Sequence, residues 1–225
     1  MAVADQIKSI NKELEGSLAK LIAVSKTKPN ELIVEAYENG HRAFGENKAQ
    51  ELVDKSETLP KDIEWHMIGH LQRNKVKYIA PFVHLIHGVD TIKLLKEINK
   101  EGRKNDRMIP CLLQIHIAEE DTKFGLDANE VKELLESELL NELEHVSIAG
   151  LMGMATNTDD EDQVRAEFAG LAALFKKLKS SYSHPRLNLE EISMGMSGDY
   201  KIAVEEGSTM VRIGSTIFGA REYSK

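Results

Sequence analysis

The sequence predicts an α/β protein with a single domain, a closed (β/α)8 barrel that carries one extra helix at its N-terminus. Three observations favour this fold class. Eight short apolar runs recur along the chain, segments with helical periodicity lie between them, and a length of 225 residues suits one barrel domain covering 1–225. Regular alternation of strands and helices indicates a parallel sheet.

The predicted strands are short runs rich in Val, Ile, Leu and Met, at 21–27, 42–47, 63–69, 84–90, 111–117, 146–154, 191–196 and 210–218. Apolar residues at spacings of three and four predict helices at 31–39, 48–58, 92–103, 129–140, 160–181 and 200–206, with an N-terminal helix at about 3–16. Pro29 suits a first helical turn, and Asp159 or Asp160 can cap the long helix. Gly40 and Gly207 lie where helices should end.

The main alternative to the barrel is an open, doubly wound sheet. That fold would predict a glycine-rich G-x-G-x-x-G turn after the first strand. The segment AVSKTKPNE, which follows the start of that strand, contains no glycine. The sequence therefore favours the closed barrel and argues against dinucleotide binding.

Charge and cysteine content exclude several classes of protein. The net charge is −8, and 29 Lys and Arg are scattered among 37 Asp and Glu, which argues against a nucleic-acid or anionic-membrane surface. The single cysteine, Cys111, rules out an intrachain disulfide and a Cys-based zinc cluster, and we interpret it as a buried strand residue. No signal-peptide pattern and no run approaching ~20 apolar residues is present, so we expect a cytoplasmic protein.

Lys26 closes the first predicted strand, and the functional face of a barrel lies at the carboxyl ends of its strands. Period-two alternation puts Lys26 on the same face as Ile22 and Val24, which directs its side chain into the barrel mouth. Partial desolvation there would disfavour the ammonium form and make the neutral amine available to condense with an aldehyde. The alternative is a surface lysine that reaches solvent beside Lys28.

The ends of the last two predicted strands suggest an anion site. Arg212 occupies an inward position of the eighth strand, so a guanidinium would lie inside the barrel. Gly214 and Ser215 open the loop where barrels commonly bind phosphate, and Ser197 starts a helix after the seventh strand. Taken singly, Ser197 could be a helix cap and Gly214 a turn residue. Their combination with Lys26 and Arg212 favours a phosphate site.

Six segments of the chain agree in identity, order and spacing with one known family. They are AVSKTKP around Lys26, FGEN at 44–47, WHMIGHLQRNK at 65–75, GLMGM at 150–154, SMGMSGDY at 193–200 and STMVRIGSTIFG at 208–219. The sequence resembles the pyridoxal phosphate homeostasis protein family, which is related in fold to the barrel domain of alanine racemase. The resemblance implies a cytoplasmic protein that holds pyridoxal 5′-phosphate (PLP) as a Schiff base and acts in vitamin B6 homeostasis.

The resemblance also implies roles for particular residues. Lys26 would form the internal Schiff base, and Arg212 would face the pyridine nitrogen. Ser197, together with the backbone at Gly214 and Ser215, would hold the phosphate. The barrel geometry, taken without the resemblance, points to the same residues, because they lie at the ends of its predicted strands.

Further contacts are implied for three residues, two of which have a plainer alternative. Asn47 and Met196 would lie near the cofactor, although Asn47 could instead be a helix cap. Lys123 is similar to a family lysine implicated in a second PLP contact, although it could be a solvated loop lysine.

His66 and His70 are four apart in strand-like sequence and do not match the H-E-x-x-H pattern, so we predict no metal site.

A carrier role is expected in place of catalysis. An arginine at the pyridine nitrogen should leave that nitrogen unprotonated and weaken the ring as an electron sink. Alanine racemases share this arginine, and a second domain and partner subunit supply an additional acid or base. This chain ends at Lys225, shortly after the eighth strand, and we expect no second domain.

We therefore predict a monomeric PLP-binding protein without robust catalytic activity. Its partners would be PLP itself and, through transfer, apo PLP-enzymes or B6 salvage enzymes, with no nucleic acid and no membrane. One alternative is a weak PLP-dependent racemase that uses His70 or Tyr200 as a second base. Another is a Schiff-base aldolase that uses Lys26 on a phosphorylated sugar.

Overall fold

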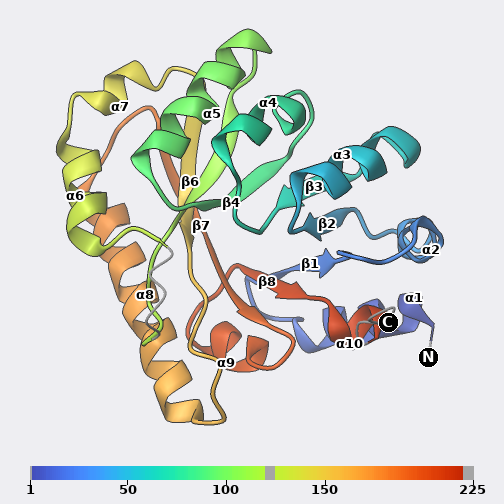
Figure 1. Cartoon of the computed structure of the whole chain (residues 1–225). Coiled ribbons are helices and arrows are strands. Elements are labelled where there is room, and N and C mark those ends of the chain that lie inside the picture. Colours follow the sequence, from blue (N-terminus) through green and yellow to red (C-terminus); the bar gives the residue numbers. More distant parts are fainter. Residues whose placement is uncertain (1, 120–124, 220–225) are drawn as a thin grey trace.

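The computed structural model describes residues 2–119 and 125–219. Within these residues, eight parallel strands pair in sequence order, and β8 pairs with β1 to close a barrel (Figure 1). The predicted fold class is confirmed. The strands are β1 (Lys20–Val24), β2 (Ala43–Glu46), β3 (Glu64–Met67), β4 (Leu85–Val89), β5 (Ile109–Gln114), β6 (Val146–Met152), β7 (Leu187–Met196) and β8 (Met210–Ile213).

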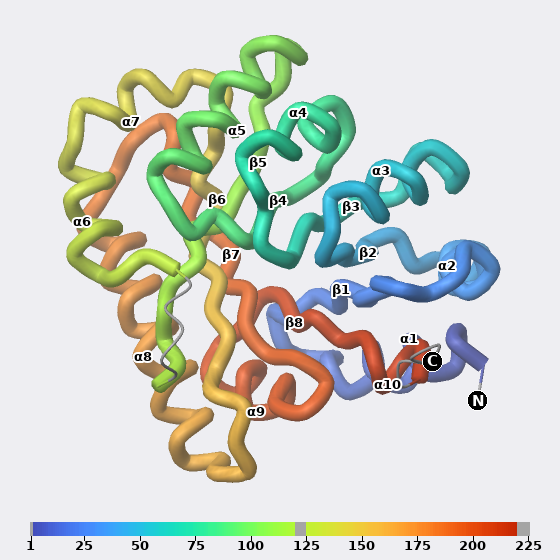
Figure 2. Tube along the Cα trace, viewed as in Figure 1, coloured from blue at the N-terminus to red at the C-terminus, as the bar shows by residue number. Residues whose placement is uncertain are grey.

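Helices cover the outside of the barrel, and Figure 2 shows the chain winding between strand and helix around it, with α1 beside α10. The helices are α1 (Val3–Glu13), α2 (Asn30–Glu38), α3 (Ala49–Thr58), the 3-10 turn η1 (Arg73–Lys75), α4 (Val76–Ile79), α5 (Ile92–Lys104), α6 (Ala128–Glu136), α7 (Leu139–Glu142), α8 (Glu161–Ser181), α9 (Tyr200–Glu205) and α10 (Ser215–Phe218). None of those in the described ranges combines the length and the apolar character of a membrane span.

The predicted helix boundaries follow local chemistry. Asp160 caps α8 as expected, because its side chain accepts hydrogen bonds from the backbone N–H groups of Asp162 and Gln163. Gly40 and Gly207 follow α2 and α9 with φ of 91° and 95°, a left-handed conformation that glycine adopts without strain. Short-range sequence signals are therefore sufficient to predict where these helices begin or end.

Two predicted elements each prove to be two elements in the structure, and one pair of elements was missed. The run at 210–218 is not one strand: β8 ends at Ile213, and α10 follows Gly214. The predicted helix at 129–140 is two helices, because Ser137 takes an extended backbone and its Oγ donates to the carbonyl of Leu134 at 2.7 Å. The short η1 and α4, between β3 and β4, were not predicted as a named element.

The apolar core forms two parts. The larger part lies between the strands and the surrounding helices and includes Phe44 and Phe168, both fully buried. The smaller part fills the barrel interior, where Ile22 and Met210 pack with Leu85, Leu112 and Met152. The inward position of Ile22 confirms the predicted alternation along the first strand, which directs the following residues toward the barrel mouth.

A chain of hydrogen-bonded polar side chains also crosses the barrel interior. Nδ1 of His66 lies 2.9 Å from Nε2 of His87, and Nδ1 of His87 lies 2.9 Å from Oγ of Ser193. Ser193 Oγ accepts a hydrogen bond from Arg212 Nη1 at 2.6 Å, and Arg212 Nη2 donates to the carbonyl of Gly153 at 3.0 Å. Apart from Nε2 of His66, which has no partner, these side chains satisfy one another in the buried interior of the barrel.

Candidate cofactor pocket

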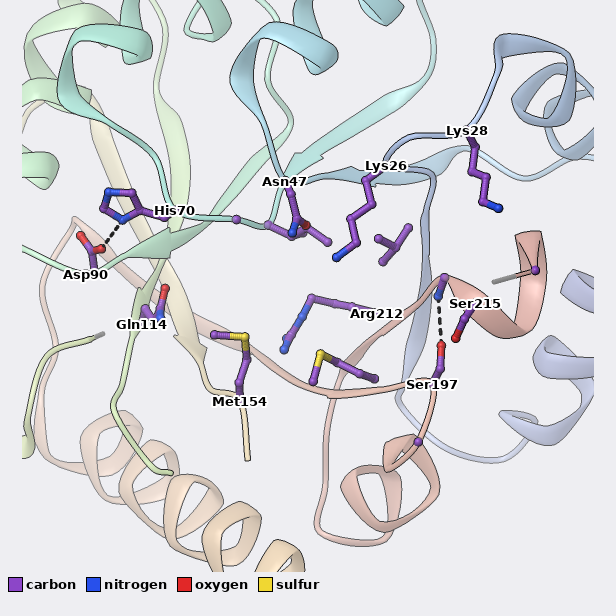
Figure 3. A pocket seen from close by; sticks show the side chains of 17 residues that line it. Lys26, Lys28, Asn47, His70, Asp90, Gln114, Met154, Ser197, Arg212 and Ser215 are labelled. Carbon is purple, nitrogen blue, oxygen red and sulfur yellow. Dashed lines mark hydrogen bonds and ion pairs between the residues drawn. The ribbon is translucent and has the colours of Figure 1, made fainter. Parts of the chain in front are cut away.

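A cavity of about 480 Å³ opens at the carboxyl ends of the strands. This volume lies in the range of small-molecule sites, about 300–1,000 Å³. Every one of the eight strands contributes a residue at or just after its end, within the described chain (Figure 3). The lining residues are Val24, Lys26, Lys28, Asn47, Ile68, Gly69, His70, Asp90, Gln114, Met154, Met196, Ser197, Gly198, Arg212, Gly214, Ser215 and Gly219.

Lys26 projects into this cavity toward Arg212, as Figure 3 shows. Strand β1 is shorter than predicted and ends at Val24, so Lys26 lies in the turn that follows. The backbone N–H of Lys28 donates to the carbonyl of Ser25 at 3.0 Å, and Thr27 adopts a φ of 64°. Such positive φ values are uncommon outside glycine, so surrounding contacts must hold this turn.

A buried ion pair behind Lys26 supplies some of these contacts. Lys55 Nζ lies 2.8 Å from Oε1 of Glu46 and donates to the carbonyl of Ser25 at 2.8 Å. Ser25 Oγ also donates to Glu46 Oε1 at 2.6 Å. Burial raises the pKa of Glu46 to about 7, and its ion pair with Lys55 opposes that rise. The pair was not predicted from sequence, because neither residue faces the barrel mouth.

Arg212 is buried, and its guanidinium is oriented by its hydrogen bonds to Ser193 and Gly153. Burial lowers the pKa of Arg212 to about 10, and the nearby Asp199 opposes this change. The guanidinium therefore remains charged at neutral pH. Asp199 itself accepts a hydrogen bond from the backbone N–H of Met196 at 2.5 Å, and burial raises its pKa.

The loops after β7 and β8 meet at one corner of the cavity. The backbone N–H of Gly214 donates to Ser197 Oγ at 3.2 Å, and Ser215 begins α10 directly afterwards. A Cβ atom on Gly214 would lie 3.0 Å from the carbonyl oxygen of Val24, so glycine permits the close approach of β8 to β1. Ser197 is not the cap of α9, because that helix begins after Asp199.

The structure also places two of the three remaining residues that were predicted to contact the cofactor. Asn47 lines the cavity and does not cap a helix, because Lys48 is the N-cap residue of α3. Met196 ends β7 and lines the cavity with a half-exposed side chain. Lys123 lies outside the described residues. All the remaining predicted cofactor contacts are thus brought together around one pocket, and their contact with a cofactor stays a prediction.

The two proposed second bases differ in position. His70 lines the cavity, and its Nδ1 lies 2.8 Å from Oδ2 of Asp90, on the side of the pocket away from Ser197 (Figure 3). Tyr200 is wrong as a candidate, because its hydroxyl donates to Glu13 on α1 at 2.7 Å on the outside of the barrel. Burial and the hydrogen bond to Glu13 raise the pKa of Tyr200 to about 12.

Several lining residues were missed in the sequence, and three of them lie where apolar runs close. Asp90 directly follows β4, Gln114 ends β5, and Met154 follows β6 by two residues. The signal that found Lys26 could have found them, since each lies where an apolar run closes. Gln114 and Asp90 add polar groups to the side of the pocket that holds His70.

The fold and the pocket define a class of barrel. Residues 1–222 match the family described as alanine racemase, N-terminal domain. The solved alanine racemase from Bartonella henselae shares the fold with a TM-score of 0.73 at 15% identity, covering 97% of this chain and 58% of that chain. The protein is therefore a barrel of the alanine racemase N-terminal class.

Closer relatives identify the group within that class. Pyridoxal phosphate homeostasis proteins from Aquifex aeolicus and Homo sapiens are 42% and 37% identical, covering 91% and 95% of this chain and 88% and 81% of their own lengths. PipY of Synechococcus elongatus, solved without PLP, matches with a TM-score of 0.89 at 34% identity, covering 96% of this chain and all of that one. The chain belongs to the pyridoxal phosphate homeostasis protein family, as its motifs predict.

Proposed function

We propose that this protein binds PLP as a Schiff base on Lys26 and acts in cytoplasmic PLP homeostasis without robust amino-acid catalysis. The observation that carries the proposal is the convergence of Lys26, Arg212 and the Ser197–Gly214 loop contact on one cavity. A relative, PipY, has also been solved with PLP bound, and that structure matches this one with a TM-score of 0.85.

The residues present fit the chemistry of PLP. The aldehyde needs an amine, which Lys26 offers, and their condensation forms a carbon–nitrogen double bond with release of one water molecule. The phosphate needs hydrogen-bond donors, which the hydroxyl groups of Ser197 and Ser215 and the backbone at the start of α10 can supply. The pyridine nitrogen needs a neighbour, and Arg212 is the buried cation of the pocket.

Arg212 supports a carrier in preference to an enzyme. When bound, PLP supplies an aldehyde and a ring that can withdraw electrons from an attached amino acid. The ring withdraws electrons most strongly when its pyridine nitrogen is protonated. Arg212 keeps its own proton at neutral pH and offers only N–H donors, so it would leave that nitrogen unprotonated.

A weak PLP-dependent racemase is the second candidate. It is favoured by the His70–Asp90 pair, which places an imidazole and a carboxylate on the wall of the same cavity. Racemisation needs a second proton-transfer group opposite the lysine. His70 is the group we would assign to that role. A sugar-phosphate aldolase is less well supported, because the family membership favours the cofactor.

The absorption spectrum of the purified protein with PLP, recorded before and after borohydride, tests the proposal. We expect a band near ~420 nm that borohydride fixes covalently to Lys26. Lys26→Ala should lack the band, and Lys28→Ala should keep it, because Lys28 lines the same cavity but lies nearer its rim. A band that survives in Lys26→Ala would refute the assignment.

Two further measurements separate a carrier from a catalyst. We expect no interconversion of L- and D-alanine by the PLP-loaded protein, whereas measurable turnover that His70→Ala abolishes would favour the racemase. We expect PLP to pass from the loaded protein to apo PLP-enzymes or B6 salvage enzymes. Recovery of activity by an apo-enzyme mixed with the loaded protein measures this transfer, and no recovery would count against a donor role.

A further inference from the structure

A second cluster of polar side chains lies at the amino ends of the strands, opposite the cofactor pocket. Glu64 begins β3, His66 follows it by two residues, and His84 directly precedes β4. One ligand atom from each of the three lies within 4.8 Å of the other two. Glu64 and His84 are exposed, whereas His66 is buried, so the cluster joins solvent to the barrel interior.

His66 carries a buried nitrogen that has no hydrogen-bond partner. Its Nδ1 is occupied by His87 at 2.9 Å, while its Nε2 makes no hydrogen bond although only 2% of the residue is exposed. Buried polar atoms are almost always paired, because an unpaired one loses its hydration without compensation. Nε2 is therefore the atom of His66 that remains available to a ligand.

The position of His66 suits a metal ligand. His87 holds its Nδ1, and Nε2 is the buried ring nitrogen that has no hydrogen-bond partner. When the ring proton lies on Nδ1, the lone pair of Nε2 can coordinate a cation.

We propose that Glu64, His66 and His84 bind a divalent transition-metal cation such as zinc, with water in the fourth position. Two imidazoles and one carboxylate form a set that zinc accepts in tetrahedral geometry. Metal–ligand distances near 2.0–2.1 Å put ligand atoms about 3.3 Å apart. Reaching that spacing needs rotation of the two exposed side chains, while His66 stays where its bond to His87 holds it.

The partners of His66 form an outer shell for this site. Coordination at Nε2 leaves the ring proton of His66 on Nδ1, which then donates to Nε2 of His87. His87 in turn donates from Nδ1 to Ser193 Oγ, the same oxygen that accepts from Arg212. The cation would thus set one direction of hydrogen bonding along a chain that ends at the floor of the cofactor pocket.

The sequence alone predicts no metal site, because the only histidine pair considered there is His66 and His70, whose spacing does not match a metal-binding helix. The additional ligands are Glu64, at the start of β3, and His84, directly before β4, and the three residues come together only when β3 and β4 pair. The site is also separate from the cofactor pocket, since none of its three proposed ligands lines that pocket.

Calorimetric titration of the chelator-treated full chain with zinc chloride tests the proposal. We expect one zinc ion per chain, with affinity reduced at least about tenfold in Glu64→Gln and in His84→Ala, since even outer-shell changes cost this much. Both substitutions are at exposed positions, so the fold should persist. His184→Ala is the matched control, because that histidine contacts Asn141 elsewhere and should leave the affinity unchanged.

Thermal unfolding gives a second measurement on the same variants. A ligand that binds only the folded state raises the melting temperature. Zinc should therefore raise the melting temperature of the wild type and of His184→Ala, but not of Glu64→Gln or His84→Ala. Equal affinity in all variants would overturn the proposal. So would a loss of affinity confined to His70→Ala, which would place the ion at the His70–Asp90 pair.

Discussion

Replacing Lys55 with methionine removes one member of the buried ion pair that lies behind Lys26. The side chains of Lys55 and Glu46 are 7% and 0% exposed, and Lys55 also donates to the carbonyl of Ser25. Methionine has a similar length and no charge. The substitution therefore leaves the packing nearly intact, while Glu46, Glu51 and the Ser25 carbonyl each lose one donor. Glu46 keeps the hydrogen bond from Ser25 Oγ but loses its charged partner on the buried side.

The expected loss of stability depends on pH. Removing one partner of a buried pair costs about 3–5 kcal/mol when the other partner stays charged. Folding raises the pKa of Glu46 from 4.5 to about 7, so this group's contribution to stability is present below about pH 4.5 and is lost as the pH rises through about 7. Lys55 opposes that rise, so without it Glu46 should stay protonated to a higher pH. At pH 6 the loss should approach the cost of unmade hydrogen bonds alone, about 1–3 kcal/mol.

Urea unfolding at pH 6 and pH 8 measures both quantities. We expect Lys55→Met to be less stable than the wild type at both values, with the larger difference at pH 8. Lys179→Met removes an exposed ion pair with Glu190 and should change little, because exposed pairs contribute little. Equal stability of Lys55→Met and wild type at pH 8 would refute the reasoning, as would a larger loss at pH 6.

Three further substitutions, one of them with a control variant, test other parts of the structure. Ser193→Ala leaves Arg212 without the acceptor of its Nη1 and should cost about 1–3 kcal/mol in urea unfolding, and an unchanged midpoint would contradict the hydrogen-bond chain. Gly214→Ala brings a Cβ against β1 and should cost about 1–3 kcal/mol and weaken PLP binding in spectroscopic titration. Gly198→Ala meets no atom within 4 Å, so equal losses in both glycine variants would refute the steric argument. Phe168→Ala empties a fully buried position on α8 and should cost about 3–5 kcal/mol in calorimetry, whereas a loss below about 1 kcal/mol would mean that the core there refills.

Some of the pocket could be predicted from the sequence because it depends on backbone geometry. In an extended strand successive side chains alternate, so Ile22 in the barrel interior places Val24 at its mouth, directly before the turn that carries Lys26, and the same rule places Arg212 inside the barrel. Strand ends in a parallel barrel meet at one face. Ser197 and Gly214, which follow neighbouring strands, therefore come together with Lys26.

Other features could not be predicted, because they join residues whose separation along the chain carries no pattern. His87 contacts Ser193 across 106 positions, and Tyr200 contacts Glu13 across 187. In the sequence Tyr200 lies close to Ser197, within the same segment SMGMSGDY. Packing of α9 near α1 turns its hydroxyl outward instead, and only the closed barrel decides which helices meet.

By itself the sequence determined the alternation of strands and helices, the inward positions of Lys26 and Arg212, and the family motifs. These depend on local geometry, in which a few consecutive residues specify a direction. The tertiary structure decided the contacts made across the barrel, namely the Glu46–Lys55 pair behind Lys26, the His70–Asp90 pair on the pocket wall, and the chain from His66 to Arg212. Such polar pairs depend on strand register and barrel closure, because side chains from different elements can satisfy each other only after the whole sheet has closed.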